Sequence, residues 1–241
     1  MLKKDDERFI EDEEFGRIIV ELRRGMTSVR FTYRPDGHLL MRAPLGTSLT
    51  GLQRMVDVNR DQLRLLPHPV VPDIAFGQVI DCFRCRVVID AANALPHHVG
   101  TRWEGDTLRV SLHADEDLTD FRIKKFVSGM IGEAMGYYAA KVLLPYARNV
   151  ANSLGLKPAG MEIGRGMRKL GHCTTRNVIQ LSRNLMFMPE ELVRYIICHE
   201  LAHITHKNHS PQFHALCDKY CCGKEKALER KLRQFRFPIV L

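Results

Sequence analysis

The sequence predicts an α+β fold in which a β-rich N-terminal part packs on a helical C-terminal part that keeps one small sheet. Short alternating runs separated by turn residues fill residues 15–112 and are typical of strands. From about residue 120 the apolar positions recur with helical spacing instead. No repeat or low-complexity linker separates the two patterns. We therefore expect two regions, residues 1–119 and 120–241.

The N-terminal region is expected to be mostly strands joined by tight turns. The clearest turn signal is Pro35-Asp36-Gly37, which predicts a hairpin between two alternating runs. One helix is expected, over residues 49–66, and it ends at Pro67 because proline cannot continue a helix. The expected strands cover residues 18–22, 28–33, 39–43, 79–89, 97–103 and 107–112.

The helical region is expected to open with one long helix from Asp120 to Val150. Residues 178–181, Val-Ile-Gln-Leu, form a short apolar strand just before the next helix. That strand is expected either at the edge of the small sheet, where an extended peptide could pair with it, or inside the sheet. The sequence favours neither position.

The string His199-Glu200-Leu201-Ala202-His203 carries the most chemical information in the chain. Two histidines four residues apart project from one face of a helix, so they can share a metal ion. A tetrahedral catalytic zinc site uses three protein ligands and one open position, and a neighbouring glutamate can act as a base. Pro189, two glutamates and an apolar stripe before the string predict that it lies in a buried helix.

A third ligand has to come from beyond this helix. On an unbroken helix, His209 would lie about 15 Å from His199 along the axis, too far to share the metal. Lys207-Asn208 offers a helix end, and Ser210-Pro211 reads as the cap and first turn of a new helix. His209 would then sit at a corner and could fold back on the metal. His206 is the main rival as third ligand, and His214 is a weaker one.

Residues upstream of this string resemble a known family. Residues 168–174, Arg-Lys-Leu-Gly-His-Cys-Thr, followed by residues 178–185, resemble the Arg-x-x-Trp-Gly-Ser-Cys and Ile-x-Leu-Asn pattern of the YgjP-like metallopeptidases. That family of predicted zinc-dependent hydrolases is related to the SprT-type and WLM-type proteases. The Leu-x-x-x-Pro of residues 185–189 and the His-Ser-x-x-Phe of residues 209–213 are also similar to the family, as is the opening strand at residues 18–24.

The resemblance implies a zincin-like metallopeptidase domain over residues 120–241, with zinc on His199, His203 and His209 and Glu200 as the general base. Four positions depart from the family pattern without removing a ligand or the base. They are Leu170 for tryptophan, His172 for serine, Ser182 for asparagine and His214 for tryptophan.

The composition places limits on the compartment. The N-terminal residues contain no apolar stretch suited to a signal peptide, and no run of about 18 apolar residues could span a membrane. We therefore expect a cytoplasmic protein that does not bind membranes. The seven cysteines are an odd number, which favours reduced thiols over a disulfide framework. Cys82-x-x-Cys85 with Cys221-Cys222 could form a second, structural zinc site, but the usual spacing is missing.

The net charge of +8 comes from the C-terminal region. Residues 151–241 hold 15 basic and seven acidic side chains, whereas residues 1–150 are balanced. Much of the excess lies on an amphipathic stretch at residues 224–236. A basic surface near a cleft could attract DNA, although no nucleic-acid-binding motif accompanies it and a solvated helix face is the simpler interpretation.

These observations predict a zinc-dependent metallopeptidase that hydrolyses a peptide or protein substrate through a zinc-bound water activated by Glu200. Two alternatives stay open: a zinc hydrolase acting on a non-peptide amide or ester, and a non-catalytic zinc-binding module close to DNA. The oxyanion formed during hydrolysis needs a further hydrogen-bond donor. His172, Tyr195 and His214 are the candidates.

Overall fold

The computed structural model describes residues 8–68, 71–93, 100–164 and 169–240, and its contacts divide the chain into two compact units. Unit 1 is Met1–Val71 and unit 2 is Pro72–Leu241. The boundary expected at residues 119 and 120 falls inside unit 2. That a metallopeptidase domain begins at residue 120 stays a prediction. Residues 97–99 of an expected strand, and Arg168 of the family pattern, lie outside the described residues.

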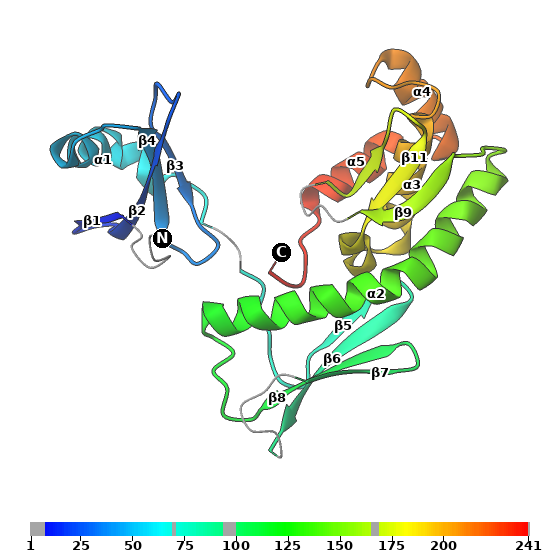
Figure 1. Ribbon diagram of the computed structural model, residues 1–241, viewed down its shortest axis with the longest axis horizontal. Coiled ribbons are helices and arrows are strands. Elements are labelled where there is room, and N and C mark those ends of the chain that lie inside the picture. The colour runs from blue at the N-terminus through cyan, green and yellow to red at the C-terminus, as the bar shows by residue number, and fades with distance from the viewer. Residues whose placement is uncertain (1–7, 69–70, 94–99, 165–168, 241) are drawn as a thin grey trace. The chain divides into compact units, whose positions relative to one another are not determined.

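Unit 1 is a four-stranded sheet with one helix. Helix α1 (Leu49–Arg64) is capped by Ser48, whose hydroxyl accepts a hydrogen bond from the Gly51 N–H, and it lies beside the sheet in Figure 1. Its residues Leu52, Val56 and Leu63 are buried against the strands. The strands are β1 (Phe9–Asp12), β2 (Gly16–Arg23), β3 (Arg30–Tyr33) and β4 (Leu39–Pro44), in the order β1-β2-β4-β3. The expected hairpin is confirmed, because β3 and β4 pair antiparallel around Gly37.

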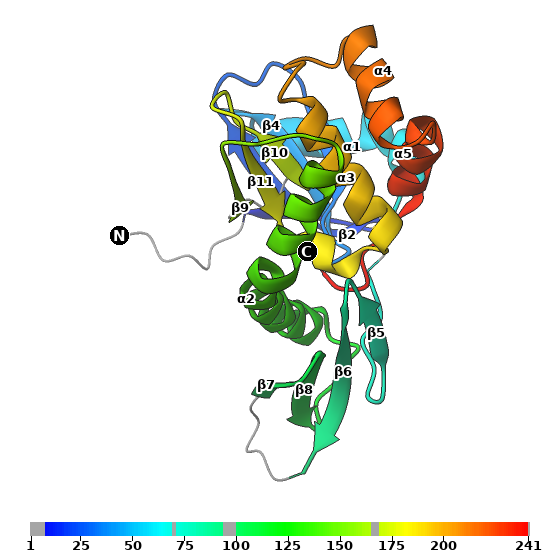
Figure 2. The ribbon, with the colours of Figure 1, turned by 90° about the vertical axis from the view of Figure 1, so that its right-hand side faces the viewer.

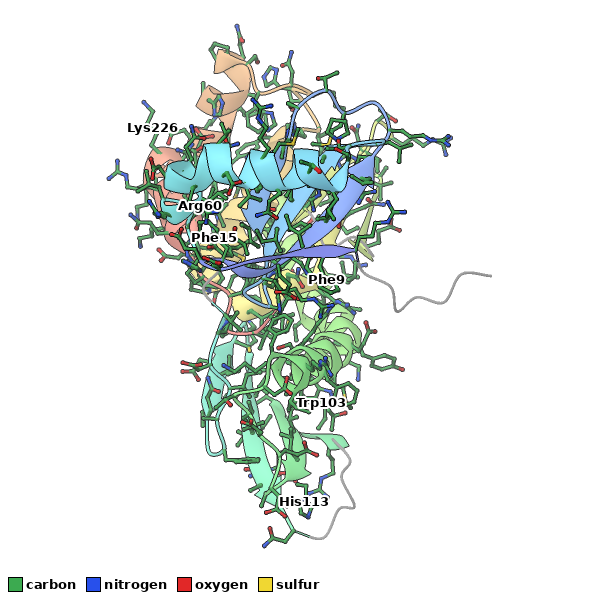
Figure 3. All side chains as sticks on the ribbon, turned by 90° about the vertical axis from the view of Figure 1, so that its left-hand side faces the viewer. Phe9, Phe15, Arg60, Trp103, His113 and Lys226 are labelled. Atoms are coloured by element: carbon green, nitrogen blue, oxygen red, sulfur yellow. The ribbon has the colours of Figure 1, made fainter. Side chains whose placement is uncertain are left out.

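A partly buried ion pair joins the helix and the sheet of unit 1. Both terminal nitrogens of Arg60 on α1 donate to the Asp12 carboxylate, at 3.0 and 2.9 Å, and Figure 3 shows Arg60 above Phe15. The Asp12 side chain is only 2% exposed. Hydrogen bonding to Arg60 lowers the pKa of Asp12 from 3.8 to about 2.

Unit 2 begins with a second four-stranded sheet, in the order β5-β6-β8-β7, that packs on the long helix α2 (Phe121–Ser153). Trp103 and Tyr138 stack across this interface with ring centroids 4.2 Å apart, and Figure 3 shows Trp103 between sheet and helix. The expected strand over 79–89 is two strands joined by a turn at Phe83-Arg84. The four strands are β5 (Val79–Cys82), β6 (Cys85–Ala92), β7 (Gly100–Glu104) and β8 (Thr107–His113).

Helix α2 is the long helix against which the sheets of unit 2 pack. Asp120 caps its first turn by accepting from the Arg122 N–H. Pro145 lies inside the helix and removes one backbone donor, and Figure 1 shows that the helix bends along its length. The helix contacts both sheets of unit 2, through β7 in the first and β9 (Gly160–Gly164) in the second.

The second sheet of unit 2 is small and lies beside the helix that carries the HExxH string. Its strand β11 (Val178–Ser182) lies between β10 (Gly171–Cys173) and β9 (Gly160–Gly164), so β11 is an internal strand. Of the two positions left open by the sequence, the internal one is therefore observed. A 3₁₀ turn, η1 (Arg183–Phe187), leads from β11 to α3 (Glu190–Ala202).

Helix α3 lies at the centre of the C-terminal part of unit 2. It packs on α2, β10 and β11 and on the two last helices, α4 (Pro211–Tyr220) and α5 (Glu225–Gln234), as Figure 2 shows. Leu192, Val193, Ile197, Cys198 and Leu201 are almost completely buried. Together with the strands and helices of unit 1, this arrangement confirms the α+β class. No helix in the described part of the chain is long and apolar enough to cross a membrane.

Candidate metal centre

Helix α3 carries three of the four residues singled out by the sequence. Pro189 precedes its first residue, and Glu190 and Glu191 occupy the first turn, where the helix dipole favours negative charge. The last turns hold His199 and Glu200, and His203 is the C-terminal cap residue. The buried surroundings expected for this helix are therefore confirmed.

The helix ends earlier than predicted. It stops at Ala202, so the expected end at Lys207-Asn208 was wrong. Instead of capping α3, the Lys207 ammonium donates to the Asn177 Oδ1 atom at 2.6 Å and to the Thr174 carbonyl at 3.1 Å. These bonds fasten the segment after α3 to the turn between β10 and β11. The lysine is therefore used as a tertiary anchor rather than as a local helix stop.

The next helix begins as the sequence indicated. Ser210 is its cap, with its hydroxyl accepting from the Phe213 N–H at 3.3 Å, and Pro211 occupies the first turn. His209, immediately before this cap, lies at the corner between the two helices and turns back toward α3. The predicted corner is thus present, although the break that creates it begins at His203 rather than at Asn208.

The three histidines meet in space. The Nε2 atoms of His199 and His209 lie 3.1 Å apart, and one ligand atom from each of His199, His203 and His209 lies within 4.8 Å of the others. Two nitrogens of a tetrahedral zinc site with bonds of 2.0–2.1 Å are about 3.3 Å apart. The spacing of this histidine triad is therefore suited to a single metal ion. It is the only such group found among the described residues.

A buried phenylalanine contacts the rings of all three histidines of the triad. The ring of Phe213, on the first turn of α4, is fully buried, and its centroid lies 4.9 Å from the His199 ring, 4.4 Å from His203 and 4.9 Å from His209. The three imidazoles therefore rest on one rigid apolar surface that limits their rotation. The sequence pattern contained Phe213, but only the structure shows this role.

A backbone carbonyl fixes the orientation of one imidazole. The Nδ1 atom of His203 lies 2.9 Å from the carbonyl oxygen of His206, which requires a proton on Nδ1 and leaves Nε2 free. The His206 side chain is not part of the triad, so the main rival for third ligand contributes through its backbone. Metal-binding histidines usually have such a partner on their second nitrogen.

The local environment keeps the two helix-borne imidazoles neutral. Burial, followed by repulsion from His203, lowers the pKa of His199 from 6.5 to about 4. Burial also lowers the pKa of His203, against the opposing effect of the His206 carbonyl. Neutral imidazole is the form that binds a metal, so these residues are ready to do so at neutral pH.

Glu200 faces away from the solvent and toward strand β10. It is 6% exposed, and burial raises its pKa from 4.5 to about 7, opposed by a hydrogen bond from the Cys173 N–H and by the charge of Lys169. Gly171 makes room for it, because a Cβ atom at that position would lie 2.6 Å from the Glu200 Cγ atom. Glycine here is required by a close approach of the glutamate, which the sequence could not indicate.

Comparison with known families agrees with this geometry. Residues 106–235 match the model of the YgjP-like metallopeptidase domain. The chain belongs to this family. The YgjP-like match spans α2, the small sheet and the whole histidine triad, so the resemblance seen in the sequence is confirmed. No curated protein matches the chain significantly.

Two solved structures are similar to part of this YgjP-like chain. The metallopeptidase zymogen jannalysin of Methanocaldococcus jannaschii is 26% identical, with 38% of this chain and 94% of that chain covered and a TM-score of 0.34. The metallopeptidase zymogen abylysin of Pyrococcus abyssi is 24% identical, with 42% and 98% covered and a TM-score of 0.32.

The remaining sequence candidates lie outside the triad. Cys82, Cys85, Cys221 and Cys222 belong to no group of ligating side chains that could hold a metal within the described residues. The basic stretch forms α5, where Lys231 pairs with Glu191 and Arg233 with Glu229, while Lys226 projects outward in Figure 3. DNA binding through this helix stays a prediction.

Proposed function

We propose that the protein is a zinc-dependent metallopeptidase, with His199, His203 and His209 as the metal ligands and Glu200 as the general base. The observation that carries the proposal is the meeting of three imidazole nitrogens beside one buried carboxylate. A purely structural zinc site uses four protein ligands and needs no base, whereas a catalytic site keeps one position open. Membership of the YgjP-like family supports the same conclusion.

A zinc ion on this triad would supply the Lewis acid that polarises the scissile carbonyl and lowers the pKa of water towards 7. Side chains of the protein transfer the proton and hold the ligands in position. Glu200 accepts a proton from the attacking water and then delivers it to the leaving amine. Burial raises the pKa of Glu200, which favours a carboxylate that can both accept and release a proton. Phe213 and the His206 carbonyl keep the imidazoles in place.

Strand β10 supports a peptide as the substrate. Bonds from Ser182 N–H to the Leu170 carbonyl and from Thr174 N–H to the Val178 carbonyl, both 2.9 Å, fix which backbone groups face β11. By alternation, Gly171 and Cys173 turn their backbone groups to the outer edge of the sheet, and the Cys173 N–H reaches Glu200. An extended peptide could pair only with the groups of this edge other than the Cys173 N–H, which Glu200 already occupies. Recognition would then be mainly through the main chain.

A single substitution tests the base. Glu200→Gln keeps the shape and hydrogen-bonding reach of the side chain but removes its basicity, so zinc content should be unchanged and casein hydrolysis should fall about 10²- to 10⁴-fold. Glu190→Gln, at an exposed position of the same helix, is the matched control and should keep full activity.

The outcomes separate the alternatives. A native chain that binds zinc but hydrolyses only small esters or amides would point to the non-peptide hydrolase. Zinc binding with no hydrolysis of any kind would point to the binding module. A native chain without zinc after purification free of chelators, or a Glu200→Gln variant with full activity, would refute the proposed mechanism.

A further inference from the structure

A groove of about 540 Å³ runs along strand β5, and we call it the β5 groove. Its size lies in the range of about 300–1,000 Å³ that is typical of ligand-binding clefts. It is lined by residues 78–84, by residues 187–190 and by residues 235, 236 and 238, all of them in unit 2. Pro189, at the start of α3, lies about 15 Å along the helix axis from His199. The β5 groove is therefore separate from the metal centre.

The edge of β5 borders this groove, rather than one of its faces. Successive side chains of a strand point to opposite faces, so a wall made by one face would contain only every second residue. Here seven consecutive residues, 78–84, line the groove, which requires the backbone edge itself to face it. Strand β5 is the first in the order β5-β6-β8-β7, and Figure 2 shows it at the outer side of its sheet.

Pairing with β6 leaves the backbone groups of Val79 and Asp81 open. The Ile89 N–H donates to the Gln78 carbonyl at 3.0 Å, and the register of β5 and β6 continues from there to the turn. In an antiparallel ladder every second residue bonds to the neighbouring strand, so Val79 and Asp81 turn their N–H and C=O groups to the outer edge. Within the described residues, no hydrogen bond from another element reaches these groups.

The walls of the groove are fixed by contacts of their own. The Phe83 N–H donates to the Met186 carbonyl at 2.6 Å, which ties the β5–β6 turn to η1. The C-terminal segment is held in the same way, because the Val240 N–H donates to the Ser128 hydroxyl of α2 at 3.0 Å and Ile239 is only 2% exposed. A groove formed before its partner arrives lowers the entropic cost of binding.

The side chains of the groove combine apolar surface with two free charges. The apolar part of the lining is Val79, Met188, Pro189, Phe235 and Pro238. Val79 is 53% exposed. Arg84 and Glu190 neutralise each other at 3.2 Å, whereas Asp81 has no ion pair in the part of the chain that the structure describes. Arg236 donates only to two backbone carbonyls of its own segment, so its charge also lacks an acidic partner there.

These features match a single extended chain better than a second copy of the protein. In any antiparallel pairing of two β5 edges, Asp81 would lie opposite Gly77, Val79, Phe83 or another Asp81, and never opposite a cation. An extended segment of another protein can instead place a lysine or arginine opposite Asp81 and an acidic side chain near Arg236. Its remaining side chains would cover the apolar lining.

We propose that the β5 groove binds an extended segment of a partner protein by strand addition to β5. The segment has apolar residues at alternate positions, a cationic side chain opposite Asp81 and an anionic one near Arg236. Main-chain bonds to Val79 and Asp81 supply affinity, and the side chains supply selectivity. None of the lining residues belongs to the histidine triad or is Glu200. The inference is therefore independent of the proposed peptidase function.

Fluorescence anisotropy with the full chain tests the proposal. The probe is a fluorescein-labelled eight-residue peptide that has valine at alternate positions and threonine, lysine, threonine and glutamate between them. Saturable binding of one peptide per chain is expected. N-methylation of the backbone amides at the four polar positions should weaken binding at least about tenfold, because these N–H groups face β5 when the lysine lies opposite Asp81. N-methylation of the valine amides is the matched control and should change the affinity less than about threefold.

Variants of the chain locate the binding site. Asp81→Lys should weaken binding of the probe about five- to tenfold, and a probe with glutamate in place of lysine should restore it. Val79→Pro removes one open donor at a position where an edge strand tolerates proline, and it should weaken binding about threefold or more. The matched control is Asp115→Lys, because Asp115 is also exposed but does not line the groove. All three variants should hydrolyse casein like the native chain.

Several results would overturn the proposal. One is the absence of saturable binding to the native chain. Another is equal affinity of the native chain, Asp81→Lys and Val79→Pro, which would place the peptide elsewhere, for example at the triad. A dimer in sedimentation experiments that Asp81→Lys dissociates would assign the groove to a second copy instead. A chain that binds the probe through Asp81 but hydrolyses nothing would refute the peptidase function alone.

Discussion

Gly171→Ala should disable the base without touching the metal ligands. The new Cβ atom would lie 2.6 Å from the Glu200 Cγ atom and 2.7 Å from its Oε1 atom, whereas ordinary contacts begin near 3.4 Å. The glutamate must therefore move by about 0.8 Å, the difference between those separations. The backbone itself accepts alanine, since Gly171 is not among the residues with positive φ.

The size of the effect follows from this displacement. A misplacement of about 1 Å at a reacting group costs about 10²-fold in rate, which corresponds to about 2.7 kcal/mol in the activation barrier. We expect kcat to fall by about that factor while the zinc content stays at one ion per chain, because the three atoms nearest to the new Cβ atom all belong to Glu200.

The assay combines peptide hydrolysis, zinc stoichiometry by elemental analysis and thermal unfolding. Gly160→Ala is the matched control, because Gly160 lies in the same small sheet and a Cβ atom there would meet Val178 at an ordinary 3.6 Å. A Gly171→Ala variant with zinc bound and kcat within about twofold of the native chain would show that β10 does not confine Glu200. Loss of zinc together with activity would show that the substitution disturbs the metal ligands rather than Glu200 alone.

Two further predictions concern stability. Because Arg60 lowers the pKa of Asp12 from 3.8 to about 2, this pair stabilises the folded chain fully above about pH 4, and the contribution disappears as the pH falls through 2. Asp12→Asn should remove about 1–2 kcal/mol of that acid-dependent stability, after allowance for solvent screening. The free energies of unfolding of the native and variant chains, plotted against pH, should therefore converge between pH 5 and pH 2. Parallel plots would contradict the assignment. Phe213→Ala should cost about 3–5 kcal/mol in the free energy of unfolding, since the ring is fully buried, and should also weaken zinc binding because three imidazoles lose their support. Denaturant unfolding and a chelator competition measure the two effects, and unchanged zinc affinity would show that Phe213 supports only the core.

The sequence predicted the local features of the site well, because short-range chemistry determines them. The spacing of the HExxH string, the Ser210 cap and the proline after it are sufficient to place a corner before α4. The same reasoning predicted too long a helix α3, since Lys207 can cap a helix as well as anchor a turn. Its actual partners, Thr174 and Asn177, lie 33 and 30 residues earlier, and local patterns do not report such contacts.

Long-range packing explains the other differences. The strands β5–β8 read as part of a β-rich N-terminal region, yet they share their core with α2, which the sequence separated from them at residue 119. A strand can be predicted from its own residues, but the strands that pair with it cannot, so the position of β11 inside its sheet was not predictable. For the same reason, the sequence contained Gly171 and Phe213 without indicating that each of them contacts a residue of the site.

The placement of His209 has a consequence for folding. Two residues of the triad end α3, and the third precedes α4, so a metal ion bound to all three would cross-link the two helices through a loop of a few residues. Local opening of α4 and α5 would then require release of the ion, and their amide protons should exchange with solvent more slowly as free zinc rises. In such a chain, the supply of metal would regulate the lifetime of the protein as well as its chemistry.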